Sequence, residues 1–268
     1  MLDNSIIFLD KNSVFDLNGK VALVTGGASG IGEGISMGLS LFGVKIAIAD
    51  INETKAKEVV KKICANDGNA IYIKTDISKK SSVKDMIKEV LDKYEELDIA
   101  VNCAGIKGTN LSSSEDFTEN NLEKLTKTML FGEFFCCQEE AKYMIAQKKG
   151  KIVNISSISG NIVNKGMIGI APYCAIKAGI IHMTRALAVE WAKYNINVNS
   201  ISPGYTITPI TKPIFNIKER YETYMDQIPL KRLAMPNDYI GAVVFLSSDS
   251  ANYITGQNLI IDGGVTLW

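Results

Sequence analysis

The segment Thr25-Gly26-Gly27-Ala28-Ser29-Gly30-Ile31-Gly32 follows a short apolar run, Val21 to Thr25, and precedes a stretch of helical character from about Ser29 to Phe42. A short apolar run that ends in glycines is typical of a strand buried on both faces. Glycine lets the backbone turn tightly and approach a ligand, and the free N–H groups at the start of the helix attract a phosphate. The segment therefore predicts a phosphate-binding turn, with an ordinary glycine-rich turn as the alternative.

Asp50 ends the second apolar run, Val44 to Ala49. A carboxylate at the end of the second strand accepts hydrogen bonds from the ribose hydroxyls of an adenosine and repels a 2′-phosphate. Neither Gly27 nor Ile51 is an Arg or Lys that would bind such a phosphate. The pattern favours NAD over NADP as the cofactor, and the alternative is that Asp50 only caps the next helix.

Apolar strand-like runs and helix-like stretches alternate along the rest of the chain. Further strands are expected at 70–74, 99–102, 151–155, 197–201 and 258–261, and helices at about 54–65, 83–94, 122–147, 173–194 and 237–246. This alternation predicts right-handed βαβ units in an α/β Rossmann fold: a doubly wound, mostly parallel sheet with helices on both faces. No linker or repeat divides the chain, so we expect one domain over residues 18–268 after an extension of residues 1–17.

The composition excludes several classes of protein. Lys plus Arg and Asp plus Glu both number 29, which gives no basic surface for nucleic acid or for an anionic membrane. Five cysteines without a C-x-x-C pair and a single histidine, His182, argue against a metal site and fit a reducing cytoplasm. The short apolar run at residues 5–9 is flanked by acidic residues, unlike a signal peptide, and no stretch is long enough to span a membrane.

Seven short motifs occur in a fixed order from about residue 16 to residue 264. They are TGGASGIG at 25–32, Asp76-Ile77, NCAG at 102–105, NISS at 154–157, YCAIK at 173–177, SPG at 202–204 and DGG at 262–264. With these motifs the chain resembles the short-chain dehydrogenase/reductase family. Each motif is common by chance, whereas the seven in this order are specific.

The resemblance implies a set of cofactor-binding residues. By position in the motifs these are Gly26, Ser29, Gly30, Ile31, Gly32, Asp50, Asp76, Ile77, Asn102, Ala104, Gly105, Tyr173, Lys177, Pro203, Gly204, Thr206 and Thr208. Asp76 and Ile77 correspond to the pair that contacts adenine. Cys103 stands where the family usually has a second Asn, and we interpret it as a small buried residue rather than a nucleophile.

Tyr173 and Lys177 are four residues apart on an expected helix, so they share one face. A nearby ammonium group favours the phenolate and makes Tyr173 suited to act as an acid/base. The resemblance gives Tyr173 this role, and it gives Lys177 the roles of tuning the phenol and holding the cofactor ribose. It also selects Ser157, three residues before Gly160, over Ser156 and Ser159 as the serine that binds the substrate oxygen.

Two features depart from the family's common pattern. Met129 stands where many members have an Asn that takes part in a water-mediated proton relay through Lys177. The segment between Ser157 and Tyr173 is also longer than in many members, so we expect residues 161–171 to line the substrate site. Residues 206–232 are expected to form a lid over the substrate.

These features predict an NAD-dependent oxidoreductase that interconverts a secondary alcohol and a ketone. By analogy with members that share the segment SISGNIVN, a polyol, ketose or sugar acid is the first substrate class. A 3-oxoacyl-(carrier protein) reductase, a hydroxysteroid-type enzyme and a non-catalytic NAD sensor are the alternatives. The resemblance further implies a homotetramer or homodimer, with Arg185 and Glu190 on a helix that packs between subunits. We interpret His182, on the same helix, as a packing or interface residue rather than a catalytic one.

Overall fold

The computed structural model describes residues 14–106, 113–165 and 167–268. Its seven strands form one sheet in the order β3-β2-β1-β4-β5-β6-β7, and each neighbouring pair is parallel. The strands are β1 (Val21–Thr25), β2 (Lys45–Asp50), β3 (Ala70–Lys74), β4 (Ile99–Asn102), β5 (Gly150–Ile155), β6 (Ile196–Pro203) and β7 (Asn258–Ile261). The predicted doubly wound α/β fold is confirmed.

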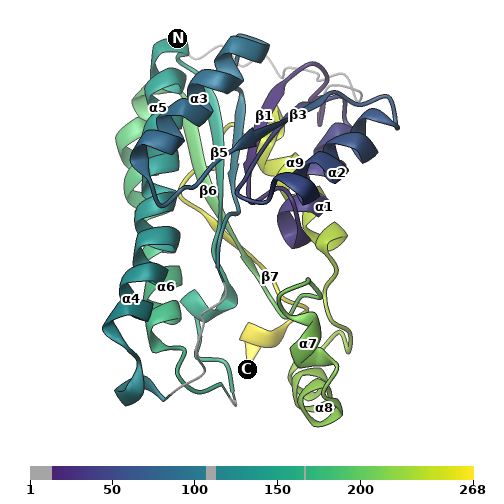
Figure 1. Ribbon diagram of the computed structural model, residues 1–268, viewed down its shortest axis with the longest axis vertical. Helices are drawn as coiled ribbons and strands as arrows, with labels where there is room; N and C mark the ends of the chain where they lie inside the picture. The colour runs from purple at the N-terminus through teal and green to yellow at the C-terminus, as the bar shows by residue number, and fades with distance from the viewer. Residues whose placement is uncertain (1–13, 107–112, 166) are drawn as a thin grey trace, which may run out of the picture.

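Helices cover both faces of this sheet, as Figure 1 shows. The helices are α1 (Gly30–Ser40), α2 (Glu53–Cys64), α3 (Lys80–Tyr94), α4 (Glu119–Thr126), α5 (Gly132–Gln147), α6 (Ala171–Trp191), α7 (Lys212–Phe215), α8 (Lys218–Gln227) and α9 (Ile240–Ser247). Helices α1, α2 and α9 pack on one face, and α3, α5 and α6 pack on the other. The central strands are buried on both faces, which explains why β1 and β4 are continuous apolar runs instead of alternating ones.

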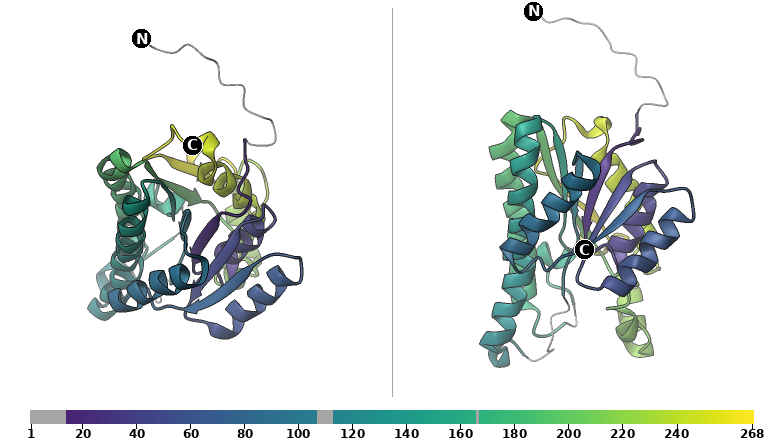
Figure 2. Two further views of the ribbon diagram at one scale, coloured as in Figure 1. Left: turned by 90° about the horizontal axis from the view of Figure 1, so that it is seen from above. Right: turned by 45° about the horizontal axis from the view of Figure 1, so that its top comes forward.

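The two faces of the sheet have separate apolar cores. Ile35 of α1 and Val243 of α9 lie in one core, and Met86 of α3 and Cys136 of α5 lie in the other. The two views in Figure 2 show the sheet running between these helical layers. Because helices cover both faces, the ends of the strands are where a ligand can reach the sheet.

The strand order reverses between β1 and β4, which are neighbours in the sheet. Thr25 is opposite both Ala49 of β2 and Asn102 of β4, so the three strands end at the same level. In open α/β sheets this reversal leaves a crevice beyond the carboxyl ends of the strands. The glycine-rich turn after β1 therefore lies at the edge of that crevice.

The observed helices differ from the expected ones in two places. The long helix predicted at 122–147 begins earlier, at Glu119, and contains a π-helical turn from Lys127 to Phe131 between α4 and α5. The segment 206–232, which we expected to form a lid, contains two helices, α7 and α8. In Figure 1 these helices lie at the lower right, and α4 lies at the lower left.

Part of the expected N-terminal extension packs against the sheet layers. Leu17 is 1% exposed, and the ring of Phe15 meets that of Phe245 edge to face at 6.4 Å. Residues 14–17 therefore already belong to the packed body, whereas the first 13 residues lie outside the part described.

Candidate active site

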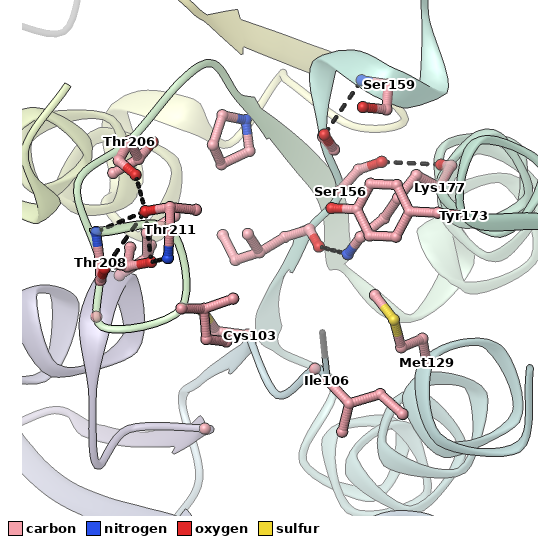
Figure 3. A pocket seen from close by; sticks show the side chains of 18 of the residues that line it. Cys103, Ile106, Met129, Ser156, Ser159, Tyr173, Lys177, Thr206, Thr208 and Thr211 are labelled. Atoms are coloured by element: carbon pink, nitrogen blue, oxygen red, sulfur yellow. Dashed lines mark hydrogen bonds between the residues drawn. The ribbon is translucent and has the colours of Figure 1, made fainter. Parts of the chain in front are cut away.

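A cleft of about 550 Å³ opens beyond the carboxyl ends of the strands, between the glycine-rich turn and helix α6. Figure 3 shows it from close by, with Tyr173 and Lys177 on one side, and Thr206, Thr208 and Thr211 on the other. Most of the predicted site residues line this cleft: Gly26, Ser29, Gly30, Ile31, Gly32, Asp50, Gly105, Ser157, Tyr173, Lys177, Pro203, Gly204, Thr206 and Thr208. The fold thus brings together residues that are far apart in the sequence.

The glycine-rich turn is built so that no side chain fits on its inner side. A Cβ on Gly26 would lie 2.7 Å from the Cα of Ala104, and one on Gly32 would collide with the carbonyl oxygen of Gly26. Gly26 and Gly30 also have positive φ angles of 68° and 58°, which glycine adopts without strain. The result is a bare backbone cradle at the N-terminus of α1, suited to a pyrophosphate.

Asp50 is fixed at the other end of this turn by two backbone N–H groups. Its carboxylate accepts a hydrogen bond from the N–H of Ala28 at 3.2 Å and another from the N–H of Asn52 at 2.8 Å. Asn52, and not Asp50, caps α2, because the Asn52 side chain accepts from the N–H of Lys55. The carboxylate of Asp50 is therefore held at the edge of the cleft without a role in starting the helix.

Helix α6 places Tyr173 and Lys177 one turn apart and facing the cleft. Pro172 lies in its first turn, where a missing N–H costs nothing. The Lys177 Nζ donates to the carbonyl oxygen of Ile155 at 2.7 Å and lies 6.0 Å from the centre of the Tyr173 ring. The ammonium group is thus anchored to the end of β5 beside the phenol (Figure 3).

The hydrogen bonds distinguish the three serines that follow β5. The hydroxyl of Ser156 donates to the carbonyl oxygen of Lys177, and the hydroxyl of Ser159 donates to Asn164. Among the described residues the Ser157 Oγ accepts from the N–H of Ser159 at 3.1 Å and donates to none of them, so its own hydrogen can point at a ligand. Gly160 allows this turn to approach α6, because a Cβ there would lie 2.7 Å from the carbonyl carbon of Lys177.

Four predicted cofactor-binding residues are not part of the cleft lining. Asp76 accepts from the N–H and hydroxyl of Ser78 at the start of α3, and the Ile77 side chain packs beside Gly132. Ala104 lies behind Gly26. The structure thus gives Asp76 a hydrogen bond to Ser78 in the turn before α3, and it gives Ile77 and Ala104 packing contacts that the motifs alone do not reveal.

Asn102 is the fourth of these residues, and its side chain points into the core beneath the cleft. Its amide donates to Glu140 and to Asn154, at 3.1 Å in each case, and Asn154 in turn donates to Thr184. The Asn102 side chain thus ties β4 to α5 and β5, and the place of Asn102 among the cofactor-binding residues stays a prediction.

Sequence reasoning missed two of the three buried carboxyl groups in the described part of α5, those of Glu133 and Glu140. Glu133 and Glu140 are 3% and 0% exposed, and each has one carboxyl oxygen without a hydrogen-bond partner in the described part of the chain. Burial raises the pKa of both carboxyl groups to about 8, and the Lys177 ammonium opposes this shift at Glu133. Near neutral pH these side chains are largely protonated, which explains how a helix facing the core tolerates them.

The remaining sequence expectations concern single residues. Cys103 lines the cleft, and burial raises the pKa of its thiol to about 12, which fits an unreactive residue. Met129 is 3% exposed in the π-helical turn, where it packs with Leu125 and Ile180. His182 is exposed on α6 and is not a packing residue within this chain.

The described residues contain no group of three or more His, Cys, Asp or Glu side chains placed to hold a metal ion. Within the same residues no helix is both long and apolar enough to cross a membrane.

The segment after Ser157 does line the cleft as expected, through Asn164, Met167 and Ile170 among others.

Comparison with known proteins agrees with this geometry. A family profile described as enoyl-(acyl carrier protein) reductase matches residues 26–266. The chain is 38% identical to an NAD-dependent glycerol dehydrogenase of Listeria innocua, over 94% of this chain and 96% of that protein. The chain belongs to the short-chain dehydrogenase/reductase family.

Two other members of the family show the range of relatives. An NADH-dependent L-xylulose reductase of Ambrosiozyma monospora is 36% identical, with 95% of this chain and 97% of that protein covered. The structure of a gluconate 5-dehydrogenase from Burkholderia cenocepacia in complex with NADP and tartrate superposes with a TM-score of 0.90 at 30% identity, covering 96% and 98% of the two chains. As a short-chain dehydrogenase/reductase, this protein is an oxidoreductase of CH–OH groups.

Proposed function

We propose that this protein interconverts a neutral secondary alcohol and the matching ketone with NAD(H), using Ser157, Tyr173 and Lys177. The observation that carries the proposal is the arrangement of these residues at the reversal of strand order. A free serine hydroxyl, a phenol and an anchored ammonium group meet beside a bare glycine cradle.

The cradle fits a dinucleotide. Gly26, Gly30 and Gly32 would take the pyrophosphate at the N-terminus of α1, and the carboxylate of Asp50 would take the adenosine ribose. Thr206 and Thr208 line the opposite end, where the nicotinamide would lie. When bound, the nicotinamide ring exchanges a hydride with the carbon that carries the hydroxyl group.

The protein's own residues manage the proton. In the direction of oxidation Tyr173, as the phenolate, takes the proton of the alcohol, and in reduction the phenol returns it. Lys177 places its positive charge beside the phenol, 6.0 Å from the ring centre, and its bond to Ile155 keeps it in place. Ser157 donates its hydroxyl hydrogen to the substrate oxygen and stabilises the charge that develops there.

The choice of NAD over NADP depends on Asp50. Its carboxylate would meet a 2′-phosphate directly, and two backbone N–H groups prevent it from turning away. Lys177 is the one cationic side chain among the described residues that line the cleft, and it is at the catalytic end. No described lining residue would therefore compensate a 2′-phosphate.

The same shortage of cations bears on the substrate. Within the described lining no cationic side chain apart from Lys177 could hold the carboxylate of a sugar acid, so we propose a neutral substrate. The two relatives reported above are named for glycerol and for L-xylulose, which are also uncharged. The balanced charge of the chain argues against the acidic carrier protein that a 3-oxoacyl reductase would require.

We also propose that the protein is cytoplasmic and forms a homotetramer or homodimer through the exposed face of α6, where Val189 is 81% exposed beside Arg185 and Glu190. Sedimentation of the purified protein measures the size of the assembly. A monomer at micromolar concentration would contradict this part of the proposal.

The function is tested by mixing the purified protein with NAD or NADP and a panel of neutral alcohols, and following the absorbance of the reduced cofactor. Reduction of NAD by a secondary alcohol is the expected result. Binding of NAD without turnover of any alcohol or ketone would contradict the proposal and favour a non-catalytic sensor.

A further inference from the structure

The part of the cleft beyond Ser157 and Tyr173, here called the substrate half, is walled mainly by apolar side chains. They come from three segments that the fold brings together: the chain around α4 and the π-helical turn, the segment after Ser157, and helix α7. Among them are Phe117, Leu125, Met129, Met167, Ile170 and Phe215. Figure 3 shows Met129 and Ile106 lying below Tyr173 on the same side of the cleft.

The polar side chains in this half are bonded to one another in a chain of fixed direction. The amide of Gln227 donates to the carbonyl oxygen of Thr223 in α8, which leaves the Gln227 Oε1 to accept from the Tyr205 hydroxyl at 3.2 Å. The Tyr205 oxygen then accepts from the Asn164 amide at 3.3 Å, and the Asn164 Oδ1 accepts from the Ser159 hydroxyl at 2.6 Å.

This chain ends at the catalytic serine, because the N–H of Ser159 donates to the Ser157 Oγ. Ser159, Asn164 and Tyr205 are each at most 7% exposed, so their bonds are shielded from water. The Tyr205 ring also contacts the Tyr224 ring at a tilt of 48°, with ring centres 4.5 Å apart, which holds α8 against the same chain. The hydroxyl hydrogens of Ser159 and Tyr205 and one N–H of the Asn164 amide are therefore already used within the protein.

The threonines on the opposite wall are occupied in the same way. Thr208 and Thr211 bond to each other, with 3.0 Å between their hydroxyl oxygens, and the Thr211 hydroxyl also donates to the carbonyl oxygen of Thr206. In the described lining of the substrate half, the hydroxyl groups free to donate to a ligand are those of Ser157, Tyr173 and Tyr224. In the proposed reaction, the hydroxyl groups of Ser157 and Tyr173 both bind the substrate oxygen that changes between alcohol and ketone, so neither is available to a second substrate hydroxyl.

We infer that the substrate is a ketone or secondary alcohol whose other substituents are hydrocarbon, such as a ring or an alkyl chain, in place of the hydroxyl-rich chain of a polyol. This inference rests on the proposed function and names its substrate class. Each methylene group buried against these walls favours binding by about fourfold. Beyond one hydroxyl that Tyr224 could bind, each additional hydroxyl must either lose its hydrogen bonds to water or break the chain that positions Ser157.

Two matched pairs of alcohols test the inference with the whole protein and NAD. Cyclohexanol and myo-inositol share a six-carbon ring, and 2-hexanol and D-glucitol share a six-carbon chain, so within each pair only the number of hydroxyls differs. We expect kcat/KM to be at least about 100-fold higher for the hydrocarbon member of each pair, because the polyol would bury several hydroxyl groups without hydrogen-bond partners. Equal or faster oxidation of the polyols would overturn the inference and leave the proposed function intact.

Substitution of one wall residue gives an independent measurement. Met167→Gln places an amide in the substrate half, and it should lower the hydrocarbon-to-polyol ratio of kcat/KM at least about tenfold. Val163→Gln is the matched control, because Val163 is on the same segment, 77% exposed and outside the cleft lining, and its ratio should stay within twofold of wild type. An unchanged ratio in Met167→Gln contradicts the inference, whereas absence of turnover for all four alcohols with both cofactors overturns the proposed function and this inference with it.

Discussion

Replacement of Asp50 by Asn should weaken the preference for NAD over NADP. The carboxylate is held by N–H groups at 2.8 and 3.2 Å, so it cannot rotate away from a 2′-phosphate. Two unit charges 4 Å apart repel by about 1 kcal/mol in water and by about 4 kcal/mol at an effective dielectric constant of about 20. Asp50 is half-buried, so we take roughly 2–3 kcal/mol, or a 30- to 150-fold change in specificity.

The assay compares kcat/KM for NAD and NADP at a fixed, saturating concentration of an alcohol substrate. Asp50→Asn keeps the size of the side chain and should raise the NADP-to-NAD ratio by the factor given above. Glu53→Gln is the matched control, because Glu53 is an exposed carboxylate nearby, paired with Lys57 at 2.6 Å and outside the cleft lining. The reasoning is refuted if Asp50→Asn leaves the ratio within threefold of wild type, or if Glu53→Gln changes it as much.

Three further substitutions test the interior of the site. The pKa of Glu140 is raised from 4.5 to about 8, so the folded protein is most stable at low pH, where this carboxyl group is neutral, and it loses that stability as the pH rises through 8. Glu140→Gln keeps a neutral side chain at every pH. Its free energy of unfolding in urea should therefore exceed that of wild type by on the order of 2–4 kcal/mol at pH 9 but not at pH 5. Cys103→Ser should keep turnover within threefold of wild type, because burial keeps the thiol protonated, and a loss beyond about 100-fold would identify Cys103 as a reacting group. Met129→Asn should lower the free energy of urea unfolding by about 1–3 kcal/mol, since it buries an amide among Leu125 and Ile180, and an equally stable variant would show that the amide finds partners there.

The sequence predicted those parts of the fold that depend on local pattern. The run Val21–Thr25 and the glycine turn after it were identified correctly because a central parallel strand is apolar on both faces and its ligand turn requires glycine. The end of the first helix could also be predicted from Gly43, because helices often end at a glycine with a positive φ; the φ of Gly43 is 74°. The pairing of Tyr173 with Lys177 followed from their spacing on one helix.

Features that depend on packing between distant segments were not predictable. Nothing in the sequence distinguishes Glu133 and Glu140 from exposed acidic residues, and only the contact of α5 with the sheet shows that they are buried. Asn102 belongs to a motif beside the cofactor, yet its side chain turns toward Glu140 and Asn154. The bonds of Asn164 to Ser159 and Tyr205 join residues up to 41 positions apart.

We propose that Tyr173 transfers the proton, and that its hydroxyl group contributes far more to this step than to the affinity for the cofactor. Tyr173→Phe removes that one oxygen, and a proton-transferring side chain is worth about 10²- to 10⁴-fold in rate. The direct measurement is turnover of wild type and Tyr173→Phe with the best alcohol of the panel, together with titration of NADH binding to both proteins. We expect a loss of kcat within that range with NADH affinity within about threefold of wild type; a variant that keeps more than a tenth of the wild-type turnover would show that Tyr173 does not transfer the proton.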